Sequence, residues 1–243
     1  MRKLTAYTAT LLLFFAAGSA YADIYGYVDA QGNAHFSTEK LDKRYHLFAR
    51  GAASFHANST IGGEARPMSP ALFRYLSSHP NLKKFEPMLD GAAKEYGLQP
   101  ALLKAIMAAE SGFNPAAVSP KGAIGLMQIM PETAERYGLQ ADKQRSLSQK
   151  LADPQTNIRL SARYLRDLHK LFPGQPELVI ASYNAGEGAV QKYRNSIPPY
   201  PETRNYVQLV SQFYRIYQPS GDIPATAAAD GARNGKRIHM IIP

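Results

Sequence analysis

Apolar residues recur at intervals of three and four through the middle of the chain, which is the spacing of one face of an α-helix. In the first such segment, Phe85, Leu89 and Ala93 share a face, and Gly97 follows as a stop signal. Segments with the same period predict further helices over 100–111, 131–138, 154–171, 177–185 and 203–217. We therefore expect a mainly α-helical domain with short connections.

A different pattern precedes this region. Residues 24–28 and 34–36 are rich in β-prone side chains and flank a turn that contains Gly32, which predicts a small β-hairpin. A lone hairpin is only marginally stable in water. The β-branched residues between Lys236 and Ile242 are therefore expected to add a strand to it. This short stretch resembles a module of unknown function found at the front of many exported bacterial proteins.

The first residues have the three parts of a secretory signal peptide. Arg2 and Lys3 precede an apolar run over 11–17, and Ala20 and Ala22 supply the small residues that a signal peptidase recognises. The alternative is a transmembrane anchor, but the run is shorter than the ~20 residues that span a bilayer. We expect cleavage after Ala22, a periplasmic location and no stable membrane insertion.

These patterns divide the chain into five parts. The expected parts are a signal peptide over 1–22, a hairpin module over 23–48, a linker over 49–78, a helical domain over 79–217 and a flexible tail over 218–243. The linker and tail are rich in Gly, Pro and Ala without sustained periodicity.

Composition excludes several kinds of chemistry. The chain has no Cys, which removes disulfide scaffolds, thiolate metal sites and cysteine nucleophiles. The six His residues form no zinc-binding string, and there is no phosphate-binding loop, dinucleotide fingerprint or nucleophile elbow. The net charge of +9 is spread along the chain without a nucleic-acid motif, so it suits an anionic envelope surface better than nucleic acid. No metal or cofactor is expected.

Glu110 is the first candidate for chemistry. It ends an almost wholly apolar helical segment, 105–111, where the negative end of the helix dipole disfavours an ionised carboxylate. Apolar surroundings raise its pKa in the same direction, as a general acid working near neutral pH requires. The alternative is an exposed terminal Glu without a role.

A second candidate follows at Gly125-Leu126-Met127-Gln128. Gly122 and Gly125 allow a tight backbone that a ligand can approach closely. The Gln128 amide needs hydrogen-bond partners if it is buried, and a sugar offers them. The alternative is a buried turn in which Met127 and Met130 pack in the core.

Together these residues resemble the catalytic domain of the soluble lytic transglycosylases, a lysozyme-like family that acts on bacterial peptidoglycan. The resemblance covers about 85–217 and has four matches in the family's order. They are Glu110-Ser111-Gly112-Phe113-Asn114-Pro115; Gly125-Leu126-Met127-Gln128; Ala181-Ser182-Tyr183-Asn184-Ala185-Gly186; and Pro201-Glu202-Thr203-Arg204-Asn205-Tyr206-Val207.

The resemblance implies a role for each candidate residue. Glu110 would be the catalytic acid and base, and Tyr183 would place its hydroxyl beside it. The residues expected to bind the glycan are Ser111, Met127, Gln128, Tyr183 and Asn184. The residues expected to support the site are Gly125, Glu202, Arg204 and Tyr206. The end of 177–185 can also be an ordinary helix end capped by Gly186.

The family's reaction needs one carboxylate, because the 6-hydroxyl of the muramic acid ring attacks the anomeric carbon and forms a 1,6-anhydro ring. A hydrolytic lysozyme of the same fold would need a second carboxylate. The candidates for it are Asp142, Asp153, Glu187 and Glu202. A third possibility is a glycan-binding assembly protein that serves a secretion or conjugation machine, although retention of Glu110 argues against it. The family usually has Gly where this chain has Ser161, which predicts slightly wider helix packing and no loss of activity.

Overall fold

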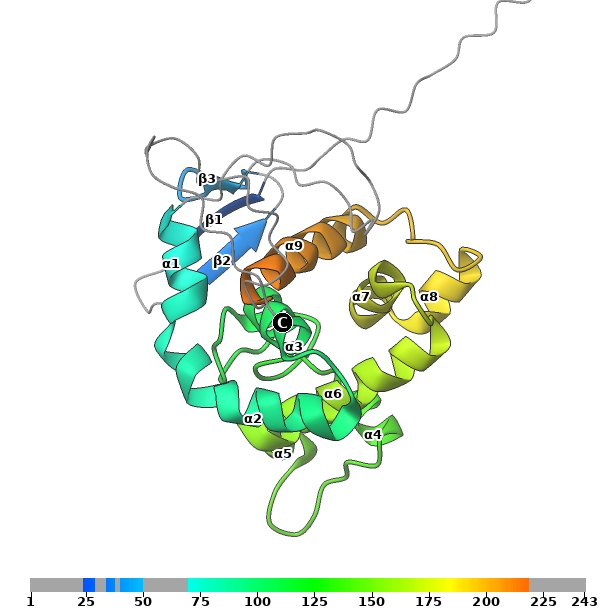
Figure 1. Ribbon diagram of the computed structural model, residues 1–243. Helices are drawn as coiled ribbons and strands as arrows, with labels where there is room; N and C mark the ends of the chain where they lie inside the picture. The colour runs from blue at the N-terminus through cyan, green and yellow to red at the C-terminus, as the bar shows by residue number, and fades with distance from the viewer. Residues whose placement is uncertain (1–23, 29–33, 38–39, 50–69, 219–243) are drawn as a thin grey trace, which may run out of the picture.

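The computed structural model describes residues 24–28, 34–37, 40–49 and 70–218 (Figure 1). The expected signal peptide, most of the expected linker and the expected C-terminal tail lie outside these residues. The pairing expected for 236–242 lies outside them as well.

The N-terminal strands form a three-stranded antiparallel sheet in the order β2-β1-β3. Strands β1 (Ile24–Val28) and β2 (Ala34–Ser37) are the two arms of the predicted hairpin, with Tyr27 opposite His35. Strand β3 (His46–Ala49) pairs with the other edge of β1. This strand is too short for its alternation to stand out in the sequence.

Nine helices lie within the described residues. Their bounds are α1 (Pro70–Ser78), α2 (Pro80–Tyr96), α3 (Pro100–Ser111), α4 (Pro131–Arg136), α5 (Leu147–Leu151), α6 (Pro154–Leu171), α7 (Pro176–Ala185), α8 (Glu187–Lys192) and α9 (Pro201–Tyr217). The six predicted helices are all present, and α1, α5 and α8 are additional. Helices α5 and α8 span five and six residues, less than the window that a period of 3.6 needs. Helix α1 occupies the last part of the segment expected to be a linker.

Local signals set the ends of the long helices. Proline opens α3 and α6 in the first turn, where no backbone N–H is needed. The Asp153 carboxylate caps α6 by accepting a 2.8 Å hydrogen bond from the Thr156 backbone N–H. Gly97 and Gly112 close α2 and α3 in the left-handed conformation.

Helix α3 lies at the centre of the helical domain. Apart from Lys104 and its last two residues it is apolar, and Leu103, Ile106 and Met107 are completely buried, as expected for a helix enclosed by others. Helix α9 packs along it, and α2 packs against α6 (Figure 1). Val210 and Phe213 of α9 are also completely buried. The core therefore holds α3, with Glu110 in its last turn, between surrounding helices.

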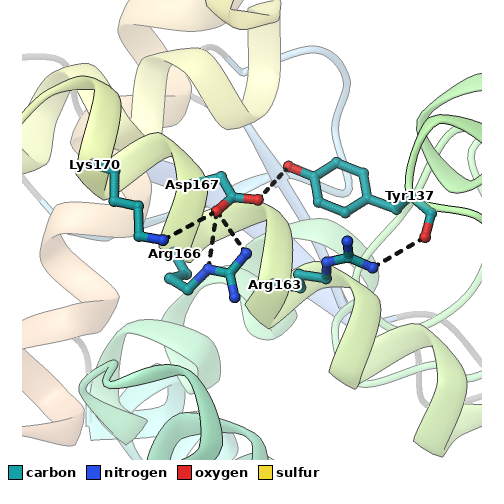
Figure 2. Close-up of polar contacts among 5 residues, drawn as sticks. All are labelled: Tyr137, Arg163, Arg166, Asp167 and Lys170. Carbon is teal, nitrogen blue, oxygen red and sulfur yellow. Dashed lines mark hydrogen bonds and ion pairs between the residues drawn. The ribbon is translucent and has the colours of Figure 1, made fainter.

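Helix α6 anchors the segment that follows α4. The Tyr137 hydroxyl donates to Asp167, and the Arg163 guanidinium donates to the Tyr137 carbonyl, each over 3.1 Å (Figure 2). Arg166 and Lys170 surround the same carboxylate of Asp167. No helix in the described part of the chain is long and apolar enough to cross a membrane.

Candidate active site

Glu110 is the penultimate residue of α3 and is partly buried. The Tyr206 hydroxyl, from α9, donates a 2.6 Å hydrogen bond to Glu110 Oε1. Burial raises the pKa of Glu110 to about 7, the Tyr206 hydrogen bond opposes this shift, and the negative charge of Glu202 adds to it. At neutral pH the carboxyl is therefore divided between its protonated and ionised forms, so that it can both give and take a proton.

The turn after Glu110 is held in an unusual conformation. Gly112 and Phe113 both have positive φ angles, 55° and 71°, and a non-glycine residue rarely adopts this conformation. The Tyr75 hydroxyl donates to the Gly112 carbonyl, and the Asn81 amide donates to the Phe113 carbonyl, each over 3.0 Å. The His79 ring stacks on Phe113 with centroids 4.8 Å apart. Helices α1 and α2 thus secure the end of the helix that carries Glu110.

A compact loop over 117–130 lies next to this turn in the structure. Short β-bridges join Ile124 to Val118 and to Ile129. Gln128 has a φ of 47°, and its side-chain amide donates to the Ala117 and Gly125 carbonyls over 3.1 and 2.9 Å. The Gln128 amide N–H groups therefore brace the loop from within. Its Oε1 atom accepts no hydrogen bond from the described residues.

Two expected glycan-binding residues have internal roles instead. The Ser111 hydroxyl is buried and contacts the Leu126 carbonyl at 2.8 Å and the Met107 carbonyl at 3.2 Å. Met127 is completely buried, so its side chain packs in the core and does not line an open groove. The alternative of a packing methionine is correct for Met127, because a completely buried apolar side chain gains more free energy from burial than from exposure.

Tyr183, which was expected to place its hydroxyl beside Glu110, directs its hydrogen bond to the neighbouring loop. The Tyr183 hydroxyl, from α7, donates to the Met127 carbonyl over 2.8 Å, and Tyr206 is the tyrosine bonded to Glu110. Burial raises the pKa of Tyr183 well above its usual value, and the negative charge of Glu110 adds to this. Tyr183 is therefore close enough for the charge of Glu110 to act on it, but its hydroxyl proton is used in the hydrogen bond to the loop backbone.

Comparison with known proteins relates this helical region to a family. Residues 87–201 match the model of the transglycosylase SLT domain. The helical region is therefore similar to the SLT domain over these residues. Residues 11–53 match a second model, a domain of unknown function named DUF4124, in agreement with the module expected at the front of the chain.

Relatives of the SLT domain carry related names. The membrane-bound lytic murein transglycosylase C of Haemophilus influenzae (strain ATCC 51907 / DSM 11121 / KW20 / Rd) is 35% identical over 117 residues, which cover 44% of this chain and 33% of the relative. The protein of the same name from Yersinia enterocolitica serotype O:8 / biotype 1B is 35% identical over 122 residues, or 46% of this chain and 34% of the relative. The match thus spans about a third of the length of these curated relatives.

A solved structure shares the fold. The 70-kDa soluble lytic transglycosylase, in complex with bulgecin A, aligns with a TM-score of 0.52 and 28% identity over 60% of this chain and 26% of that chain. The predicted fold class, a mainly α, lysozyme-like domain with a small β module, is confirmed.

The remaining expected site residues lie around the start of α9. The Thr203 hydroxyl donates to Asn184 Oδ1 over 2.9 Å and ties the end of α7 to α9. Glu202 is exposed and forms a 3.2 Å ion pair with Lys121, which connects α9 to the 117–130 loop. Arg204 is exposed, and within the described residues its side chain forms no hydrogen bond or ion pair, so its expected role in bracing the wall stays a prediction. Of the three supporting residues expected here, Tyr206 contacts Glu110 directly.

Glycine is required at position 125 for a structural reason that the sequence did not indicate. Its φ is +82°, and a Cβ atom there would lie 2.7 Å from the side-chain nitrogen of Asn157. The absent side chain therefore makes room for Asn157 rather than for a ligand. The signal for Asn157 was a polar residue on the buried face of the 154–171 segment, four residues before Ser161.

The four candidates for a second carboxylate are engaged elsewhere or exposed. Asp142 pairs with Lys150 at 2.7 Å, which holds the pKa of Asp142 well below its usual value. Asp153 caps α6. Glu187 pairs with Arg136 at 2.5 Å and accepts a hydrogen bond from the Tyr164 hydroxyl. Glu202, which pairs with Lys121, is the one of these four whose charge acts on Glu110. No group of three His, Asp or Glu residues within the described ranges is arranged to hold a metal ion.

Proposed function

We propose that this protein is a lytic transglycosylase that cleaves the β-1,4 bond between N-acetylmuramic acid and N-acetylglucosamine in peptidoglycan without consuming water. The observation that carries the proposal is Glu110, a partly buried carboxyl with a pKa of about 7 at the end of a central apolar helix. The SLT domain and the names of its relatives support the same reaction class.

Glu110 supplies both proton transfers in this mechanism. Its protonated form gives a proton to the glycosidic oxygen, and the bond from that oxygen to the muramic acid anomeric carbon breaks. The 6-hydroxyl of the same ring attacks the anomeric carbon, and the Glu110 carboxylate takes the hydroxyl proton. The products are a 1,6-anhydro-muramic acid end and a free 4-hydroxyl on the other sugar, and Glu110 is protonated again. A pKa near neutrality suits both steps.

The surroundings of Glu110 support a single-carboxylate reaction. Asp142, Asp153 and Glu187 form contacts that do not include Glu110. Glu202 lies in an exposed ion pair with Lys121. A hydrolase would need one of them to activate water. The substrate's own hydroxyl is therefore the favoured nucleophile.

We further propose that the protein works in the cell envelope on glycan strands. The relatives are named as membrane-bound murein enzymes, and the signal peptide expected over 1–22 would export the chain to the periplasm. Gln128, Tyr183 and Asn184 remain the residues proposed to border the glycan, since all three are partly exposed and the charge of Glu110 acts on Tyr183.

The test is the full chain carrying Glu110→Gln, incubated with purified peptidoglycan and analysed by mass spectrometry of the released sugar ends. We expect the wild type to produce 1,6-anhydro ends and the variant to lose at least about 100-fold of that activity, because Gln can neither give nor take the proton. Glu132→Gln, an exposed glutamate on α4, is the matched control and should remain active.

Other outcomes distinguish the alternatives. Reducing ends from the wild type would identify a hydrolase and require a second carboxylate. Glycan binding without any cleavage by the wild type would identify a binding protein. Full activity of Glu110→Gln would refute the catalytic assignment.

A further inference from the structure

Asn157 lies in the first turns of α6 and is completely buried. Its Oδ1 accepts a 2.8 Å hydrogen bond from the Met127 backbone N–H. Its Nδ2 donates to the Ile124 carbonyl at 2.9 Å and to the Leu151 carbonyl at 3.0 Å. One side chain therefore holds both ends of the tight turn over 124–127 and ties that turn to the end of α5.

Only an amide satisfies these three partners. The site needs one acceptor and two donors on adjacent atoms, which is the inventory of an Asn side chain. An ionised Asp would direct an oxygen at two carbonyl oxygens, and an apolar residue would leave three backbone groups buried without a partner. The side chain of Asn157 is thus matched to the turn atom by atom.

Gly125 brings the turn against this amide. A Cβ at Gly125 would lie 2.7 Å from Asn157 Nδ2 and 2.9 Å from Asn157 Cγ, closer than van der Waals contact permits. The backbone therefore packs directly on the Asn157 side chain. Any larger residue at 125 would push the turn or the amide out of place.

The same turn connects to Glu110 and to Gln128. Both backbone polar groups of Met127 are hydrogen-bonded. Its N–H donates to Asn157, and its carbonyl accepts from the Tyr183 hydroxyl. The Leu126 carbonyl is held by Ser111, the residue after Glu110. Gln128, which borders the proposed glycan site, follows directly. Three helices therefore fix this turn, and Asn157 makes the largest share of the side-chain bonds.

We propose that Asn157 is a positioning residue for cleavage: it sets the place of the 124–128 backbone, and through it Gln128, relative to Glu110. The Ser161 hydroxyl assists by bonding to the Asn157 carbonyl at 2.7 Å while lying next to the Tyr183 hydroxyl. Ser161 thus lies one helical turn after Asn157, between the two residues whose side chains hold Met127. This inference rests on the proposed function.

The test is Asn157→Asp in the full chain, assayed for anhydro ends at pH 7.5 and pH 5.5 beside the wild type. At pH 7.5 the ionised Asp repels the Ile124 and Leu151 carbonyls and shifts the turn, and a displacement near 1 Å costs about 100-fold in turnover. At pH 5.5 the buried Asp takes up a proton and donates to one carbonyl again, so the ratio of variant to wild-type turnover should rise about 10-fold or more. Binding to insoluble peptidoglycan should change less than about twofold.

Asn195→Asp introduces the same charge at an exposed position and is the matched control, with a ratio independent of pH. An Asn157→Asp ratio that stays constant between the two pH values would overturn the proposal. If the wild type yields no anhydro ends, the proposed function fails instead, so the two failures are distinguishable.

A measurement on the wild type does not depend on the variant folding. Residue-resolved hydrogen exchange should show the Met127 amide strongly protected, because its N–H is held by a buried acceptor. Exchange of the Met127 amide as fast as that of the exposed Lys121 amide would overturn the proposal even if Asn157→Asp does not fold at pH 7.5.

Discussion

The Tyr206 hydroxyl donates a 2.6 Å hydrogen bond to Glu110 Oε1, across 96 positions of sequence. Tyr206 is 9% exposed and comes from α9, which packs along α3. A hydrogen bond to the charged form of a carboxyl lowers its pKa, whereas burial raises it. The balance of the two effects holds the pKa of Glu110 at about 7 rather than higher.

Tyr206→Phe should raise the pKa of Glu110, because it removes the bond that favours the carboxylate while burial is retained. We expect the alkaline limb of the pH profile of kcat/KM, which reports ionisation of the acid, to move to higher pH. The profile is measured by anhydro-end formation. An unchanged limb would show that Tyr206 does not bond to Glu110 in solution.

Glu110 should also make stability depend on pH. Its folded pKa of about 7 exceeds the unfolded value of 4.5, so the folded state binds more protons between these two values. Its contribution to stability is fully present below pH 4.5 and is lost as pH rises through 7. As pH rises over this range, the free energy of unfolding of Glu110→Gln, measured with denaturant, should increase relative to that of the wild type by up to about 3 kcal/mol. A constant difference between the two proteins would contradict the raised pKa.

Tyr183→Phe should lower turnover by loosening the 124–128 turn, and it should also reduce stability by about 1 to 3 kcal/mol, because the Met127 carbonyl loses its donor. The pH limb assigned to Glu110 should stay near its wild-type position, unlike that of Tyr206→Phe. A shift as large as the Tyr206→Phe shift would indicate that Tyr183 bonds to Glu110 during the reaction.

Gly125→Ala should be more damaging than Gly122→Ala. Both glycines have positive φ, so both substitutions strain the backbone, but a Cβ at Gly122 meets nothing within 4 Å, whereas at Gly125 it meets Asn157. Overpacking of this kind costs about 1 to 3 kcal/mol beyond the shared strain. Thermal or denaturant unfolding of the two variants measures the difference, and equal losses would argue against the contact.

Tyr75→Phe should destabilise the protein by about 1 to 3 kcal/mol, since the Gly112 carbonyl at the end of α3 loses its partner. Ser77→Ala, on the exposed side of the same helix, should change stability by less than about 0.5 kcal/mol. The comparison tests whether α1, which precedes the matched 87–201 segment, is part of the folded unit around Glu110.

The sequence by itself determined the long helices and most of their ends, although α2 begins five residues before the predicted Phe85 and α9 two residues before the predicted start. The 3.6-residue period of α2, α3, α6 and α9 and the adjoining Pro and Gly are local signals, so they can be interpreted without tertiary contacts. Helices α5 and α8 were not predicted because each is shorter than two turns. Helix α1 was not predicted because the Pro- and Gly-rich residues before it favoured a linker. Glu110 was identifiable for a similar reason, since a lone carboxyl at the end of an apolar helix is visible in the order of residues.

Only the tertiary structure decided which side chain meets which. Tyr183 and Tyr206 carry the same hydroxyl group, so either could donate a hydrogen bond to Glu110. Because α9 packs along α3, Tyr206 is the one that does. In the same way, Gly125 makes room for Asn157, which comes from α6. Met127 lies in the core rather than in a groove. Partners far apart in sequence are selected by how the helices pack, and packing depends on the shape of the whole core rather than on any one segment.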